Sequence, residues 1–129
     1  MANDQTKVSS YRDLLVWEKG IGLVTLLYEI SREFPADERF GLTSQIRRAA
    51  VSVPSNIAEG QARFSTREFI HFISHAEGSI AEIDTQLVIA LELDFCKAAK
   101  VKPAFDAIVE LRKMLNSLRR KLQERDLQK

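Results

Sequence analysis

Apolar side chains recur every three or four positions through most of the chain, which is the spacing of one face of an α-helix. Two such stripes run side by side in the first periodic segment, so it predicts a helix with an unusually wide apolar face. The pair Phe34-Pro35 predicts the end of this helix, because proline disfavours helical geometry in the residue before it. One stripe comprises Leu14, Trp17, Ile21, Val24 and Tyr28, and the other comprises Leu23, Leu27, Ile30 and Phe34.

A second periodic segment contains a proline in its middle. Its apolar stripe keeps its phase across Pro54, which predicts one helix, kinked at Pro54, at a cost of about 3 kcal/mol. The alternative is a pair of short helices, with Ser52 capping the second. The stripe comprises Leu42, Ile46, Ala49, Val53, Ile57 and Gly60.

The third and fourth segments also have helical periodicity. The third, over about residues 65–94, carries a heptad seam and opens with Ser65-Thr66-Arg67-Glu68, which predicts a capping box. The fourth is expected to begin near Pro103, a favourable first-turn residue. The two seams comprise Phe69, Ile73, Ala76, Ile80, Ile83, Leu87 and Ala90, and then Ile108, Leu111, Leu115, Leu118 and Leu122.

Four long amphipathic helices with short connections predict an all-α fold, an antiparallel up-and-down four-helix bundle. The bundle is expected over residues 11–125, between a disordered tail at residues 1–10 and a frayed C-terminus at residues 126–129. The two stripes of the first helix predict a homo-oligomer, because one would serve the core and the other a neighbouring subunit. The predicted oligomer interface comprises Trp17, Leu23, Leu27, Ile30 and Phe34.

Composition narrows the class of protein further. The 129 residues fit one domain, and the 3 prolines and 5 glycines are few for an all-β chain. The single cysteine, Cys96, excludes an internal disulfide and a cysteine-rich zinc site. Charged residues interrupt the apolar run over residues 8–34, and the first ten residues lack the apolar segment of a signal peptide. We therefore expect a cytoplasmic protein that does not enter a membrane.

The formal net charge is +1, which argues against a strongly basic nucleic-acid domain unless the charge is unevenly placed. It is unevenly placed. Residues 66–95 hold one basic and six acidic residues, whereas residues 100–129 hold nine basic and four acidic ones. The two segments are consecutive, so their helices should lie side by side and cancel part of each other's charge.

Three stretches together resemble a known family. "DLLVWEKG" (13–20), "FGLTSQIRRAAVSVPSNIAEG" (40–60) and "EFIHFISHAEGSIAEIDTQL" (68–87) resemble the bacterial 23S rRNA intervening-sequence proteins. A related branch is the accessory variability protein of diversity-generating retroelements. The resemblance covers about residues 11–122 and implies a helical bundle assembled into a homopentameric ring. It also implies no established enzymatic activity, with nucleic acid as the expected partner.

Arginine and lysine side chains are candidates for nucleic-acid contacts, because a guanidinium contacts phosphate in a bidentate manner and is always charged. A second interpretation is structural, with ion pairs to Glu59 or to the acidic third helix, or favourable cation placement near a helix C-terminus. The candidate nucleic-acid-binding residues are Arg47, Arg48, Arg63, Arg67, Arg112, Lys113, Arg119, Arg120, Lys121 and Arg125.

Candidate chemistry is sparse. His71 and His75 are spaced to share one helix face, but the zincin pattern fails because Phe72 follows His71 where that pattern has glutamate. Asn56 and Glu59 would form a polar network that fixes helix register, and Cys96 would be a packed residue. We predict no catalytic residue, no metal and no cofactor.

The leading functional hypothesis is a non-enzymatic, ring-forming homo-oligomer that acts as a scaffold or a weak nucleic-acid-binding protein. The alternative is a protein–protein interaction adaptor that binds no nucleic acid. A metal-dependent enzyme built around the histidine pair is a further alternative.

Overall fold

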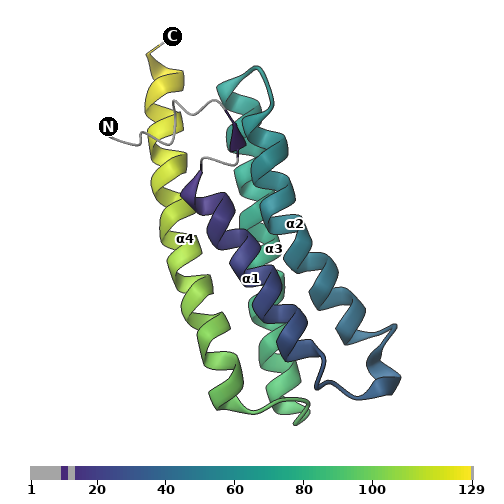
Figure 1. Ribbon diagram of the computed structural model, residues 1–129. Coiled ribbons are helices and arrows are strands. Elements are labelled where there is room, and N and C mark those ends of the chain that lie inside the picture. Colours follow the sequence, from purple (N-terminus) through teal and green to yellow (C-terminus); the bar gives the residue numbers. More distant parts are fainter. Residues whose placement is uncertain (1–9, 12–13, 129) are drawn as a thin grey trace.

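The computed structural model describes residues 10–11 and 14–128, and it is helical throughout its regular elements. Within these ranges no strand occurs, and none of the helices is long and apolar enough to cross a membrane. Figure 1 shows successive helices running in opposite directions, which confirms the predicted all-α bundle. The elements are α1 (Leu15–Ser31), the 3-10 turn η3 (Ala36–Glu38), α2 (Leu42–Gln61), α3 (Thr66–Glu92) and α4 (Ala98–Leu127).

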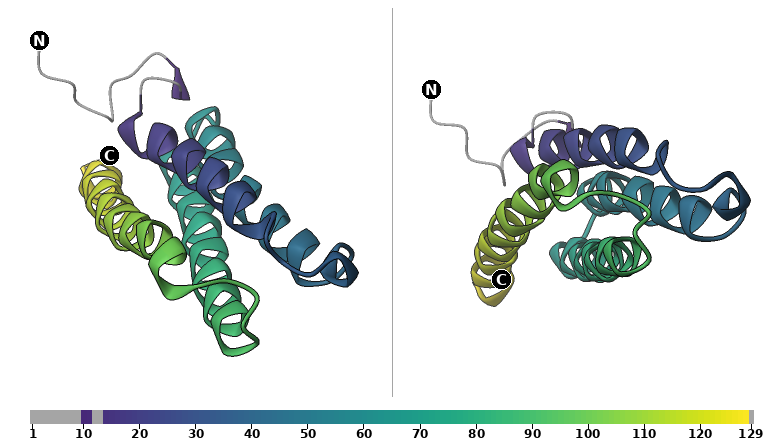
Figure 2. Two further views of the ribbon diagram at one scale, coloured as in Figure 1. Left: turned by 60° about the horizontal axis from the view of Figure 1, so that its bottom comes forward. Right: turned by 90° about the horizontal axis from the view of Figure 1, so that it is seen from below.

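The four helices enclose one hydrophobic core. Each helix packs against its neighbours in the sequence, and α4 returns to pack against α1, as the view from below in Figure 2 shows. Leucine, isoleucine, valine and alanine fill the space between them, and burying one Leu or Ile side chain contributes about 1.5–3 kcal/mol. All the predicted seam residues of α3 and α4 are buried in this core.

The second helix runs unbroken through its proline, so the single-helix prediction for α2 is confirmed. Pro54 is buried against α1, where a Cβ built at Gly20 would lie 3.4 Å from the Cβ of Pro54. On its other side α2 is joined to α3, because the hydroxyls of Ser52 and Ser79 lie 2.5 Å apart and share a hydrogen bond. Ser52 also donates to the carbonyl of Ala49 at 2.7 Å. The helix is therefore held from two sides at the level of its proline.

The end of α2 approaches α3 more closely than a side chain would allow. A Cβ built at Gly60 would lie 2.8 Å from Cδ1 of Phe69 and 2.8 Å from Cβ of Phe72. Gly60 therefore lets the two helices begin their contact directly at the turn. The turn itself ends at Ser65, whose hydroxyl accepts from the backbone N–H of Glu68 at 3.0 Å. This bond confirms the N-cap half of the predicted capping box.

Three predicted boundaries differ from the structure. The first helix ends at Ser31 rather than at Phe34, although Phe34 remains buried. The fourth begins at Ala98 rather than near Pro103, because the buried Val101 anchors an earlier turn to the core. Helix α4 also continues to Leu127, into the segment predicted to fray. The predicted tail lies outside the described residues, apart from its last position.

Replacing Gly60 with alanine should lower the free energy of unfolding by about 1–3 kcal/mol, because the added methyl group has no room between Phe69 and Phe72. The matched control is Gly22→Ala in α1, where a Cβ would meet nothing within 4 Å. That change should raise the free energy of unfolding by up to about 1 kcal/mol through helix propensity. Urea denaturation of both variants at one protein concentration measures the difference. Equal effects at the two glycines would contradict the close approach at Gly60.

Candidate functional site

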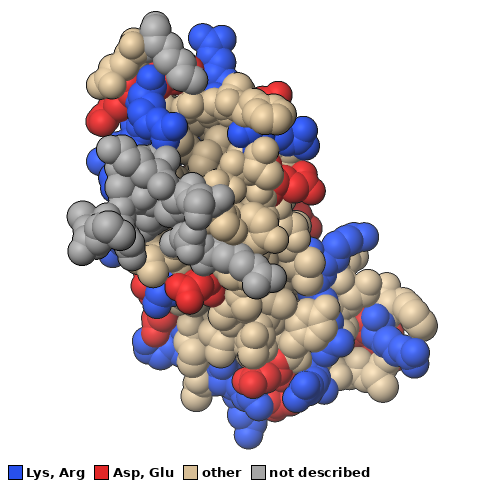
Figure 3. Space-filling model, turned by 45° about the horizontal axis from the view of Figure 1, so that its top comes forward, with Lys and Arg blue, Asp and Glu red and all other residues tan. Residues whose placement is uncertain are grey.

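An apolar groove runs along the outside of the bundle between α1 and α2. The rings of Tyr11 and Trp17 lie 5.5 Å apart at one end of it, and Ile21 and Val51 are 42% and 43% exposed along its sides. Figure 3 shows a band of uncharged side chains on this side of the molecule, bordered by charged ones. None of the described residues that line it is charged. They are Tyr11, Trp17, Ile21, Val24, Val51, Pro54, Ser55 and Ala58.

The structure reverses the predicted roles of the two stripes on α1. Most of the predicted interface is inside the bundle, with Leu23, Leu27 and Ile30 at most 2% exposed and Phe34 at 6%. Of that set only Trp17 reaches the groove. In the other stripe Leu14 is buried, Trp17 and Val24 are half-buried, and Ile21 and Tyr28 are exposed. The physical reason is Gly20, which shares a helix face with Leu23 and Leu27 and lets that face meet Pro54 closely.

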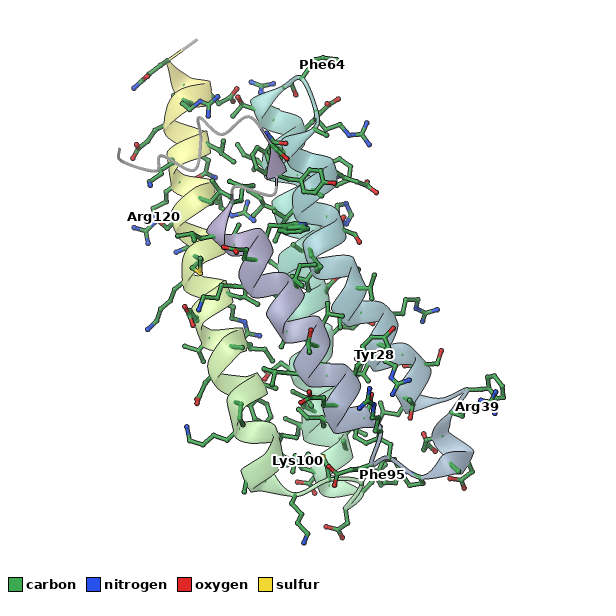
Figure 4. All side chains as sticks on the ribbon, in the orientation of Figure 1. Tyr28, Arg39, Phe64, Phe95, Lys100 and Arg120 are labelled. Atoms are coloured by element: carbon green, nitrogen blue, oxygen red, sulfur yellow. The ribbon has the colours of Figure 1, made fainter. Side chains whose placement is uncertain are left out.

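Beyond the groove, the η3–α2 turn and the facing end of α1 form a second recess that we call the arginine basin. Arg47 is fixed there, because its Nε donates to the hydroxyl of Ser31 at 2.8 Å and its guanidinium carbon lies 4.6 Å from the centre of the Tyr28 ring. Figure 4 shows Arg39 on the turn that projects past the helices. The basin is lined by Tyr28, Arg39, Phe40, Thr43, Ser44, Arg47, Arg48 and Val51.

Most candidate arginines elsewhere are engaged in ion pairs within the chain. Arg119 pairs with Glu77, and its Nη2 also donates to Ser74 at 3.0 Å. One heptad along both helices, Arg112 lies 3.7 Å from Asp84. These contacts form an ion-pair ladder between α3 and α4, and they confirm that the two oppositely charged helices lie side by side.

Two further arginines lie near the α2–α3 turn. Arg67 contacts Asp126 at 3.2 Å, which joins the start of α3 to the end of α4. Arg63 lies 4.0 Å from Glu59, and its guanidinium carbon is 4.8 Å from the centre of the Phe72 ring. Arg63, Arg67, Arg112 and Arg119 therefore each form an ion pair within the chain.

The remaining candidates lie on the outside of α4. Lys113, Arg120 and Lys121 are exposed, and they form no ion pair within the described part of the chain. Arg120 points away from the bundle in Figure 4. Arg125 is exposed near the end of α4 and has an interaction partner.

The histidine pair, Cys96 and Asn56 lie in different parts of the described structure and do not form one site. The Nε2 atoms of His71 and His75 lie 3.1 Å apart on the exposed face of α3, but the described residues contain no group of three or more potential metal ligands. Cys96 is half-buried in the α3–α4 connection, and burial together with the nearby Glu33 raises the pKa of its thiol. The side-chain amide of Asn56 donates to the carbonyl of Ser52 at 2.7 Å, so it supports α2.

Sequence reasoning missed two aromatic residues at the ends of α2. Phe40 is 86% exposed before the helix begins, and Phe64 is fully exposed after it ends. The available signal was that neither residue falls on an apolar seam and each directly follows an arginine, Arg39 or Arg63. Helical periodicity identifies only side chains that point from a helix to the core, so it gives no information about residues in the turns.

These features define an all-helical bundle with an uncharged groove on one side and an ion-pair ladder on another. Residues 12–117 match the 23S rRNA-intervening sequence protein family, and the chain belongs to this family. The resemblance of its three motifs is thereby confirmed at the level of the family. No curated protein matches the chain.

Exchanging the two charges of the Glu77–Arg119 ion pair tests whether this pair stabilises the fold. Glu77→Arg should lower the free energy of unfolding, and adding Arg119→Glu should restore most of it, with a coupling of about 0.5–3 kcal/mol. Exchanging the exposed Lys102 and Asp106 is the control, because such a surface pair contributes at most about 1 kcal/mol. Thermal and urea unfolding measure both cycles. No recovery in the double variant would show that the Glu77–Arg119 contact does not stabilise the bundle.

Proposed function

We propose that this protein is a cytoplasmic, non-enzymatic scaffold whose copies associate head to tail into a ring that binds nucleic acid weakly. The uncharged groove between α1 and α2 is the observation that carries the proposal. It holds an aromatic pair and exposed aliphatic side chains, and a neighbouring chain would remove them from water. The family resemblance implies that five copies close the ring.

A second copy is the occupant that the chain's own surface fits best. The outer face of α3 carries small, uncharged side chains at heptad spacing, which would admit the bulky residues of the groove. Gly78 lies in the middle of this face, and a Cβ there would meet nothing within 4 Å. A glycine inside a helix costs about 1 kcal/mol relative to alanine, and no contact among the described residues requires Gly78. The face comprises Gly78, Ala81, Thr85 and Val88, all exposed, and it ends at Ser74, whose hydroxyl accepts from Arg119 of α4.

The arrangement of the two surfaces supports a ring over a two-fold dimer. The groove belongs to α1 and α2, whereas the small-residue face belongs to α3, so the two halves of the contact are different surfaces. A contact between different surfaces repeats from copy to copy and closes into a ring when the rotation permits. An adaptor that binds only protein is the second candidate, favoured by the net charge of +1.

Two substitutions on opposite sides of the proposed contact should each dissociate the assembly. Ile21→Arg places a charge in the groove, and Gly78→Leu fills the small-residue face; neither change touches the core. Sedimentation velocity at micromolar concentration should show the wild type well above the 14.7 kDa of one chain and both variants near that mass. Circular dichroism should show that both variants retain their helices.

The control is Gly22→Leu on α1, because Gly22 shares its helix face with Glu18 and Glu29 rather than with the groove. This variant should assemble like the wild type. A wild-type protein that sediments as a single chain would overturn the proposal, and so would assembly of Ile21→Arg or Gly78→Leu at wild-type strength.

A further inference from the structure

The arginine basin holds three cationic side chains, and no ion pair within the described residues neutralises them. Arg39, Arg47 and Arg48 all line it, whereas most candidate arginines of α3 and α4 are paired with carboxylates. Glu38, in the turn before α2, forms no ion pair with the three basin arginines among the described residues, and its Oε1 accepts from the backbone N–H of Leu42 at 3.0 Å. The basin is therefore a site of local positive charge on a chain that is nearly neutral overall.

Arg47 is already oriented for a ligand. Its Nε donates to Ser31, its Nη2 lies 3.4 Å from the carbonyl oxygen of Tyr28, and the guanidinium covers the Tyr28 ring. A guanidinium has five N–H groups, so the Nη1 group remains available. Because the side chain is held in place, binding an anion there loses less conformational entropy than binding to a free arginine.

Phe40 adds a flat, exposed ring to the same recess. It lies on the turn before α2, is 86% exposed, and has the guanidinium carbon of Arg39 5.1 Å from its ring centre. The core gains nothing from this side chain. An exposed aromatic ring beside arginines is the combination on which an unpaired nucleobase stacks while its phosphates meet the cations.

We propose that the arginine basin binds single-stranded nucleic acid, with one base on Phe40 and adjoining phosphates on Arg47 and Arg48. This inference rests on the proposed function and names its ligand and its site. A duplex fits less well, because its bases are stacked on one another and cannot reach an aromatic ring. An acidic peptide would use the arginines but not the ring. In the proposed ring the basin recurs once per copy, which raises the apparent affinity for a long strand.

The test is fluorescence anisotropy with a labelled 20-nucleotide oligo(U) at low salt, on the full chain. Phe40→Ala should weaken binding about 5- to 150-fold, because stacking on an aromatic side chain contributes about 1–3 kcal/mol per base. Arg48→Gln should weaken binding and reduce the salt slope by about 0.7, the share of one phosphate on a single strand. Arg48 is chosen over Arg47 because it is exposed and its loss should leave the fold intact.

Two matched controls separate this site from the rest of the surface. Phe64→Ala removes a fully exposed phenylalanine at the other end of α2, and Arg120→Gln removes an exposed arginine from α4. Neither should change binding by more than about 2-fold. Oligo(dT) in place of oligo(U) distinguishes DNA from RNA, and a 20-base-pair duplex should bind more weakly than either strand.

The inference is overturned if oligo(U) and oligo(dT) do not bind at low salt, if Phe40→Ala binds like the wild type, or if the duplex or a polyglutamate competitor binds better. Sedimentation of the same samples separates this outcome from a failure of the ring. If the wild type sediments as a single chain but binds through Phe40, the ring proposal is wrong and the basin proposal stands. If the wild type assembles but binds neither oligo(U) nor oligo(dT), the basin proposal is wrong and the ring proposal stands.

Discussion

The contact between Pro54 and Gly20 is the constraint on which the rest of the molecule depends. A proline inside a helix lacks the N–H that would bond to the carbonyl four residues earlier, so the surroundings must hold the helix together. Here the ring packs against a glycine of α1, while the Ser52–Ser79 hydrogen bond fixes α2 to α3 at the same level. With α2 held as one rod, Gly60 meets α3 at one end and the η3 turn presents Phe40 at the other.

This crossing also decides which surface of α1 is available. Because Gly20 faces Pro54, the face that carries Leu23 and Leu27 turns inward, and the stripe with Ile21 is left beside α2 at the surface. The same stripe of α1 contributes to both recesses, with Ile21 in the groove and Tyr28 in the arginine basin. The distribution of charge has a different cause. Arginines of α4 that would otherwise make the surface basic are paired with carboxylates of α3 in the ion-pair ladder.

The sequence predicted the fold well because helical periodicity reports directly on burial. The seams of α3 and α4 were identified residue by residue, and the phase of the second segment across Pro54 correctly indicated one helix. The stripes of α1 could not be separated in this way, because both are apolar at the right spacing and only the packing partner distinguishes them. Gly20 did not give a usable signal either, because Gly22 lies in the same helix and only Gly20 is at a close crossing in the structure.

The basin was harder to foresee. Arg47 and Arg48 were candidates from their chemistry, but nothing in the periodic pattern places the η3 turn, Phe40 and Tyr28 around them. Pro103 led to a helix start that was too late, because the first-turn preference of proline is weaker than the burial of Val101 two residues earlier. Local preferences thus failed where tertiary contacts outweigh them.

Backbone amide hydrogen exchange, resolved by residue, tests the continuity of α2 most directly. If the Gly20 and Ser79 contacts hold the helix as one rod, the amides of residues 46–61 should be protected to a similar degree on both sides of Pro54. Two protected blocks separated by rapid exchange over residues 51–57 would mean two short helices joined by a loop. The position of the groove and of the basin relative to one another would then lose its physical basis.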